Sequence, residues 1–434
     1  MMSTRIAQRL VPIILLAAAV LFLGYGPSRS QSLQLLLGFG TAFFTYLWVD
    51  RRSQLTWKQL MVVAIVLRVL LFLAPITWTD DHYRYIWDGL CSIHGISPFA
   101  FTPDELVKTM PQVFTPALYA KLNSPHFHSV YPPVAQLVYA IAAGLGQGDI
   151  WYSTLVLRFV SIVVDLATIT ALGVLLKDAP DRVRKVGLYA LNPLVLMEFT
   201  VNLHSEVLMI APCLWAIHLF RQKRYDAAAV LIAIAAAAKL WPLILLAWIP
   251  SQLGWRRSVR FFAITLILFV ASWIPLYTPG FFAHLGSSLK LFVSYLEFNG
   301  VLFEGLRRLF GDALVKGTGL LGAIALIGLG AYSLWLWRTR RTPWPEAMLW
   351  LLAIYLSCSQ VVHPWYILPL VALAPLTRWR WPVLWSLLIV PTYLTYGSVP
   401  YAQPYWWLAI EYVVLGAFII REARGFRKPM AIGT

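Results

Sequence analysis

The sequence predicts an all-α, polytopic membrane protein, and three observations lead to this prediction. Of the 434 residues, 59% are hydrophobic and only 12% are charged, whereas average proteins carry about a quarter charged residues. Long apolar runs alternate with short basic clusters, and helices satisfy their own backbone groups in hydrocarbon. The 20 Trp and 20 Tyr residues suit the aromatic belts of the two membrane interfaces. We therefore expect a single domain over residues 1–434 with about 12–14 membrane helices, several of them short.

The net charge of +16 does not indicate a nucleic-acid partner. Most Lys and Arg residues fall in alternate loops, which is the distribution that the positive-inside rule gives a multi-pass plasma-membrane protein. The three cysteines are widely spaced and indicate neither a metal site nor a disulfide framework. The basic N-terminus resembles a signal peptide, but it lacks a suitable A-x-A site, so we expect an uncleaved first helix.

The basic loops also give the order of the membrane spans, with the N-terminus inside. The spans 10–25 and 32–49 precede a basic loop, and the span 58–77 then delivers Asp80 to the outer side. Further spans are expected at 150–176, 187–201, 205–220, 260–277, 313–337, 345–359, 364–376, 381–398 and 405–420.

Two apolar runs do not fit a single crossing. The run 227–250 has basic residues at both flanks, so two short helices meeting near Lys239 are expected, with Pro242 helping the break. The run 131–146 is short, and a crossing there would turn the next basic cluster outward. We therefore expect a re-entrant or surface helix at 131–146.

Two long outer segments remain between the spans. The first, about 79–149, contains a capping box at Thr102–Glu105 and a helix start at Thr115-Pro116. These signals indicate amphipathic helices that lie on the membrane surface. The second segment, about 278–312, is expected to be a loop long enough to close over a lipid headgroup.

The first outer segment opens with the densest group of acidic residues in the chain. If Asp81 begins a helix, then Asp81, Arg84, Tyr85 and Asp88 share one face, with Asp80 at the N-terminus. Gly95 and Pro98 should end that helix, and the pattern indicates the active-site loop of a membrane enzyme. A solvated loop with a helix-capping acid is the alternative.

Three other polar positions interrupt apolar sequence on the expected outer side. Lys239 lies in AAAAKLWP, where a charge costs several kcal/mol unless it is hydrated or paired; it can bind a phosphate or snorkel to the interface. The segment NLHSE, with His204 and Glu206, can bind sugar hydroxyls or orient the acid, or form a plain polar turn. His363 and Tyr366 stand in HPWY, where aromatic rings can stack on sugars or mark an interface. By contrast, Arg158 and Asp165, seven residues apart in one span, are expected to be structural.

The order of these motifs resembles the membrane glycosyltransferases of the GT-C class that use polyprenyl-phosphate sugars. The likeness covers roughly residues 78–376 and is closest to bacterial mannosyltransferase-like members and to the transferase of the first mannose of GPI anchors. Thr79, Asp80, Tyr83 and Asp88 match a T-D-x-D-Y…D pattern, while His82 replaces the second Asp. The other similar segments are GISPF, YPPVAQ, ALNPLVLMEF, AAAAKLWP and VVHPWYILPL.

The resemblance implies an inverting glycosyltransferase at the outer face of the plasma membrane. It would move a hexose, mannose by this resemblance, from a polyprenyl phosphate to a lipid-linked or cell-envelope glycan. Such transfer needs a carboxylate base and cations for the departing phosphate. The base is expected to be Asp80, with Asp81 as the alternative. The donor phosphate and sugar are expected to contact these residues: Arg84, Asp88, His204, Glu206, Lys239, His363 and Tyr366.

No cofactor is expected, and the replaced second Asp means that the pattern does not require a divalent metal. A nucleotide-binding G-x-x-x-x-G-K loop does not occur in the sequence, which suits a lipid-phosphate donor. A transporter or flippase of lipid-linked sugars is the alternative function. It accounts for the helices and intramembrane charges, but less directly for the acidic outer segment.

Overall fold

The computed structural model describes residues 2–294, 296–340, 342–398 and 400–426. In this part of the chain the elements are helices, with no strand, and two isolated bridges join Phe298 and Asn299 to Val361. The expected all-α fold is therefore confirmed.

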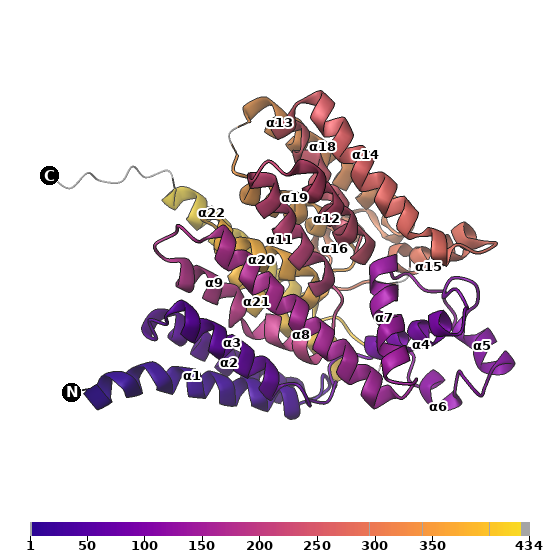
Figure 1. Ribbon diagram of the computed structural model, residues 1–434, viewed down its shortest axis with the longest axis horizontal. Helices are drawn as coiled ribbons and strands as arrows, with labels where there is room; N and C mark the ends of the chain where they lie inside the picture. The colour runs from indigo at the N-terminus through magenta and orange to yellow at the C-terminus, as the bar shows by residue number, and fades with distance from the viewer. Residues whose placement is uncertain (1, 295, 341, 399, 427–434) are drawn as a thin grey trace.

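The chain begins with three helices, α1 (Met2–Tyr25), α2 (Ser32–Arg52) and α3 (Trp57–Leu70). Helix α1 packs against both α2 and α3 (Figure 1). Thr56 and Gln59 form a capping box at the start of α3. The helix ends at Leu70, earlier than the expected 58–77, and Pro75 could not have continued it. An irregular segment then leads to Trp78.

The first outer segment folds into α4 (Asp81–Ile93), α5 (Pro103–Thr109), α6 (Pro116–Tyr119) and α7 (Pro133–Leu145). Its predicted local signals are confirmed: the capping box at Thr102, the Thr115 cap, and the helix end before Gly95, which has a φ of +73°. Helices α4 and α7 touch closely at Gly89. A Cβ atom there would lie 2.2 Å from the Tyr139 carbonyl oxygen, so only glycine fits.

The central part of the chain surrounds the long helix α8 (Ile150–Leu175). It continues as α9 (Arg182–Ala190), α10 (Pro193–Val195), a π-helix η1 (Leu196–Val201), α11 (Val207–Arg221), α12 (Tyr225–Ala238), a 3₁₀-helix η2 (Trp241–Trp248) and α13 (Pro250–Leu253). The two helices expected within 227–250 are confirmed, and Lys239 lies between them. The expected single helix over 187–201 is wrong, because Asn192-Pro193 interrupts it.

The C-terminal part contains α14 (Trp255–Ser272), η3 (Ile274–Leu276), α15 (Phe281–Ser294), α16 (Val301–Phe310), α17 (Asp312–Val315), α18 (Leu320–Thr339), α19 (Trp344–Ser357), η4 (Pro364–Ile367), α20 (Leu368–Leu373), η5 (Ala374–Leu376), α21 (Trp381–Leu388), η6 (Val390–Gly397) and α22 (Tyr405–Gly425). The expected loop at 278–312 is therefore mostly helical. In α16, the buried Glu304 accepts hydrogen bonds from Arg307 and Arg308, three and four residues later, and these contacts stabilise the helix.

Four helices in the described ranges are long and apolar enough to cross a membrane: α2, α8, α14 with η3, and α18. Six shorter apolar helices accompany them, in line with a polytopic membrane protein that contains several short helices. Figure 1 shows α4–α7 and α15 gathered at one end of the bundle, at the right of the view. The start of α1 and the end of α22 lie toward the other end.

Buried charges tie the central helices together. Asp165 accepts hydrogen bonds from Arg68, at 2.7 Å, and from the Tyr189 hydroxyl, at 2.6 Å. Arg158 donates to the backbone carbonyls of Thr200 and Phe72, at 2.9 and 2.7 Å. These contacts agree with the structural role expected for Arg158 and Asp165, although the acid pairs with Arg68 on α3.

Candidate functional site

The two acids at the start of α4 point to different partners. Asp80 takes the N-cap position without capping the helix, and its carboxylate forms an ion pair with Arg29 from the α1–α2 connection. Arg29 also lies over the Tyr396 ring, 4.8 Å from its centre. Asp81 instead accepts a hydrogen bond from Asn123 at 3.0 Å and lies 3.9 Å from Nε2 of His204. Of these two acids, Asp81 thus approaches the buried His204, which follows η1.

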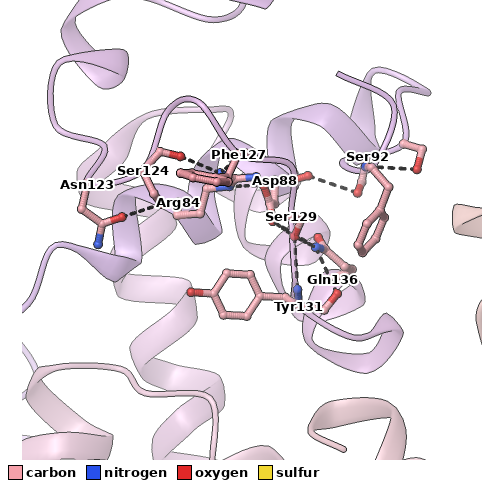
Figure 2. Close-up of polar contacts among 11 residues, drawn as sticks. Arg84, Asp88, Ser92, Asn123, Ser124, Phe127, Ser129, Tyr131 and Gln136 are labelled. Carbon is pink, nitrogen blue, oxygen red and sulfur yellow. Dashed lines mark hydrogen bonds and ion pairs between the residues drawn. The ribbon is translucent and has the colours of Figure 1, made fainter. Parts of the chain in front are cut away.

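Farther along α4, Arg84 and Asp88 hold the loop that leads to α7 (Figure 2). The Arg84 guanidinium donates to Asp88 at 2.7 Å and to the Phe127 carbonyl at 2.9 Å. Asp88 is fully buried and also accepts hydrogen bonds from Gln136 at 3.0 Å and from Ser129. These contacts place the outer segment against α4, whereas the other expected residues, apart from Asp80, collect around His204.

The π-helix η1 positions His204 and Glu206. Asn192 caps the short turn that begins at Pro193 by accepting from the Leu194 amide at 2.9 Å. The wider π turn then carries the chain to Leu203, which has a φ of +64°, and the His204 amide donates back to the Glu198 carbonyl at 3.0 Å. Both His204 and Glu206 are buried as a result.

Lys239 is the cation of this cluster, and it is already paired. It follows the last residue of α12, where a positive charge is favourable, and its Nζ lies 2.7 Å from Oε1 of Glu206. The same Nζ lies 5.4 Å from the centre of the Tyr366 ring. The Lys239 side chain is 20% exposed and Glu206 only 1%. The pair satisfies a charge that would otherwise be costly in this environment.

The HPWY segment closes the cluster from the C-terminal half of the chain. The Trp365 ring is stacked between His204 and His363, with ring centres 3.6 and 4.3 Å apart. Both faces of Trp365 are therefore covered, so it fixes the two imidazoles and offers no free face to a sugar. Burial lowers the pKa of His363 to about 3, which makes this ring neutral at physiological pH. A neutral imidazole can form hydrogen bonds but carries no positive charge.

The structure thus brings six of the expected residues into one cluster: Asp81, His204, Glu206, Lys239, His363 and Tyr366. Burial raises the pKa of Asp81, while the nearby His204 and Lys239 oppose this rise. A carboxylate with a raised pKa beside a cation is a common feature of catalytic sites. Within the described ranges, no group of three or more His, Cys, Asp or Glu side chains is arranged to hold a metal ion.

Two residues of this region were missed from the sequence. Glu198 is completely buried, and its Oε2 lies 2.8 Å from Nδ1 of His204. The available signal was an acid inside the apolar segment LVLMEFTV, since such residues usually have a functional role. Arg29 lies in a short polar loop, and nothing in its local sequence connects it with Asp80.

An apolar cavity of about 40 Å³ adjoins the charged cluster. It lies between α11, η2, α19 and α20, and its lining includes Cys213, Leu214, Trp241, Met348 and Leu373. Trp241 connects the cavity with the cluster, because its ring packs edge-on against Tyr366 at 5.1 Å. A small apolar cavity thus lies beside the charged cluster.

Comparisons with known proteins agree with this arrangement. Residues 10–253, more than half of the chain, match the family model described as alpha-(1->6)-mannopyranosyltransferase, N-terminal domain. The chain is also 25% identical over 386 residues to alpha-(1->6)-mannopyranosyltransferase A of Mycobacterium tuberculosis. That alignment covers 81% of this chain and 72% of the relative.

The helical membrane fold and these matches define the protein as a membrane glycosyltransferase of the GT-C type. More narrowly, the chain belongs to the alpha-(1->6)-mannopyranosyltransferase family. The matched range contains Asp81, Glu198, His204 and Lys239 but ends before His363. The position of the HPWY segment in the same cluster is therefore a structural observation that does not depend on the family match.

Proposed function

We propose that this mannosyltransferase moves mannose, with inversion, from a polyprenyl phosphate to a hydroxyl of a lipid-linked or cell-envelope glycan. The single observation that carries the proposal is the shared location of Asp81, Lys239 and an apolar cavity. The name of the relative supports an α-(1→6) linkage. Inversion to an α product requires a β-linked mannosyl phosphate as the donor.

The cavity and Lys239 support a lipid-phosphate donor. A phosphodiester held near Lys239 would compete with Glu206 for the ammonium group, which lies 2.7 Å from the carboxylate. The apolar chain attached to that phosphate could then pack against the wall formed by Trp241. Apolar burial provides the binding free energy that a nucleotide-sugar donor would have to obtain from polar contacts.

The geometry favours Asp81 over Asp80 as the general base. Asp80 is 37% exposed and engaged with Arg29, whereas Asp81 is 24% exposed and faces the cluster. Burial raises the pKa of Asp81 and makes its carboxylate a stronger base. This assignment reverses the order expected from the sequence, where the position directly after a membrane span favoured Asp80.

The proposed reaction is a single displacement. The acceptor oxygen bonds to the anomeric carbon while the bond from that carbon to the phosphate oxygen breaks, and its electron pair leaves with the phosphate. Asp81 takes the proton of the acceptor hydroxyl. Lys239 stabilises the negative charge that develops on the departing phosphate, where a preorganised cation has its largest effect.

We also propose that the cluster faces the outside of the plasma membrane. Of the helices assigned to the outer side from basic-residue distribution, α4–α7 and α15 gather at one end of the bundle (Figure 1). The acceptor would then be a glycan of the cell envelope.

Purified protein in lipid nanodiscs tests the proposal. With radiolabelled polyprenyl-phosphate mannose and a short mannoside acceptor, we expect labelled product whose new linkage is identified by NMR as α-(1→6). GDP-mannose in place of the lipid donor should give no product. Use of GDP-mannose would contradict the donor assignment. In proteoliposomes, movement of the lipid across the bilayer without transfer would indicate a flippase instead.

A further inference from the structure

The His204 imidazole lies between two carboxylates. Its Nδ1 is 2.8 Å from Oε2 of Glu198, and its Nε2 is 3.9 Å from Oδ2 of Asp81. The side chains of His204 and Glu198 are 1% and 0% exposed. A fully buried carboxylate is costly unless it is well paired, so the position of Glu198 requires an explanation.

Neutral donors hold Glu198 from two sides. The Tyr393 hydroxyl donates to Oε1 at 2.8 Å, and the Asn202 amide donates to Oε2 at 3.1 Å. These contacts fix the carboxylate next to Nδ1 of His204. The Trp365 ring, stacked on the imidazole at 3.6 Å, restricts rotation of His204. Nδ1 of His204 therefore lies at ion-pair distance from Glu198 without the alignment of a hydrogen bond, and Nε2 is the ring nitrogen near Asp81.

The negative charge of Glu198 beside Nδ1 favours one tautomer of His204 over the other. With the proton on Nδ1, near the carboxylate, the neutral imidazole keeps its lone pair on Nε2, and the same carboxylate stabilises the imidazolium once Nε2 is protonated. The 3.9 Å separation between Nε2 and Asp81 is longer than a hydrogen bond. Such contacts often shorten when the substrate is bound.

We infer that Glu198 is a positioning residue that makes His204 the second member of a proton relay from Asp81. The inference rests on the proposed function, since Asp81 must first act as the base. During transfer the acceptor hydroxyl proton moves to the Asp81 carboxylate as the new carbon–oxygen bond forms. The proton then passes to Nε2 of His204, which restores the Asp81 carboxylate. The imidazolium, held by Glu198, releases this proton to water after the products leave.

The relay gives the pH profile a specific cause. The ionisable groups that surround His204 come from four parts of the fold: Asp81 and His82 on α4, Glu198 on η1, Lys239 after α12, and His363 before η4. Glu198 is the negative charge next to Nδ1, so its removal makes protonation of His204 less favourable. The acid limb of kcat/KM, which belongs to the coupled Asp81–His204 pair, should then move to lower pH.

Glu198→Gln tests the inference, because the amide keeps the shape and can still accept from Tyr393. We expect single-turnover transfer to fall on the order of 10²-fold, donor binding to stay within about 2-fold of wild type, and the acid limb to move down by roughly half a pH unit. Glu411→Gln is the matched control. Glu411 is also completely buried and accepts hydrogen bonds from Asn299 and Trp385. This control should keep the wild-type acid limb.

His204→Gln provides a second test if Glu198→Gln folds poorly. It should show a similar loss, and the double variant should be no worse than His204→Gln, because the two residues act as one unit. Losses in Glu198→Gln without a moved acid limb, or additive losses in the double variant, would leave Glu198 a purely structural role and overturn the inference. If wild-type protein fails to use polyprenyl-phosphate mannose, the proposed function itself is wrong. Normal wild-type transfer with unaffected Glu198→Gln and His204→Gln rejects only the relay.

Discussion

Replacing Asp81 by Asn is the sharpest test of the active-site assignment. Asn keeps the shape of the side chain and can still accept the hydrogen bond from Asn123, which is 3.0 Å long. It cannot take a proton from the acceptor hydroxyl. A positioned general base contributes about 10²–10⁴-fold to the rate, which corresponds to roughly 2.7–5.4 kcal/mol of the barrier. We expect Asp81→Asn to lose transfer within that range.

The same substitution should not weaken the fold. Burial raises the pKa of Asp81 in the folded protein, so the ionised carboxylate is disfavoured there relative to the unfolded chain. Its contribution to stability is therefore best at pH values below the unfolded pKa and becomes unfavourable as the pH rises through the folded pKa. A neutral Asn lacks this cost, and the thermal midpoint at neutral pH should stay equal or rise.

The assay is single-turnover transfer of radiolabelled mannose, with donor binding measured on the same preparations. Asp80→Asn is the matched control, because its ion pair with Arg29 is partly exposed and such pairs contribute about 1 kcal/mol or less. Its turnover should fall less than about 10-fold. An inactive Asp80→Asn beside an active Asp81→Asn would refute the reasoning and return the base to Asp80.

Four further predictions concern the surroundings of Asp81. Lys239→Met should reduce donor use about 30- to 1,000-fold. Because this variant leaves the buried Glu206 unpaired, it should be less stable than the double variant that also carries Glu206→Gln. Equal stability of the two variants in thermal unfolding would exclude the ion pair between Lys239 and Glu206. Arg29→Gln should move the acid limb of kcat/KM to higher pH by roughly half a unit at low salt, because the charge of Asp80, no longer neutralised, raises the pKa of Asp81 further; an unmoved limb would contradict the coupling. Cys213 lies at the partly exposed rim of the apolar cavity. Cys213→Phe should raise the KM for a long-chain donor about 10-fold and leave the KM for a short-chain analogue unchanged. Equal effects on both donors would place the lipid chain elsewhere. In a background without the native cysteines, cysteine at exposed Ser287 should react with an impermeant thiol reagent from outside and cysteine at exposed Arg256 should not; the opposite result would invert the topology.

Much of the local structure could be predicted because its causes are local. The predicted capping box at Thr102 joins residues three apart, and the break at Lys239 follows from basic residues on both flanks of one apolar run. The error at 278–312 has a related origin: mixed charged and apolar residues suggested a loop, whereas α16 uses them on opposite faces and pairs Glu304 with two arginines in the next turn. Amphipathic helices of this kind depend on what their apolar face contacts.

Which residues of this mannosyltransferase meet was decided only by the tertiary structure. The acidic stretch, the isolated Lys239 and the HPWY segment each indicated chemistry from their sequence alone, because charges and aromatic clusters are unexpected in apolar surroundings. Their partners were not predictable from the sequence. Asp80 pairs with Arg29, while Asp81 reaches His204, and Glu206 takes Lys239. The side chains of neighbouring residues at the start of a helix point in different directions. A shift of one residue, from Asp80 to Asp81, therefore moves the carboxylate from the rim of the site to its centre. Glu198 became visible only when η1, Tyr393 and His204 were packed together, since the cost of burying a carboxylate is balanced by groups distant in the chain.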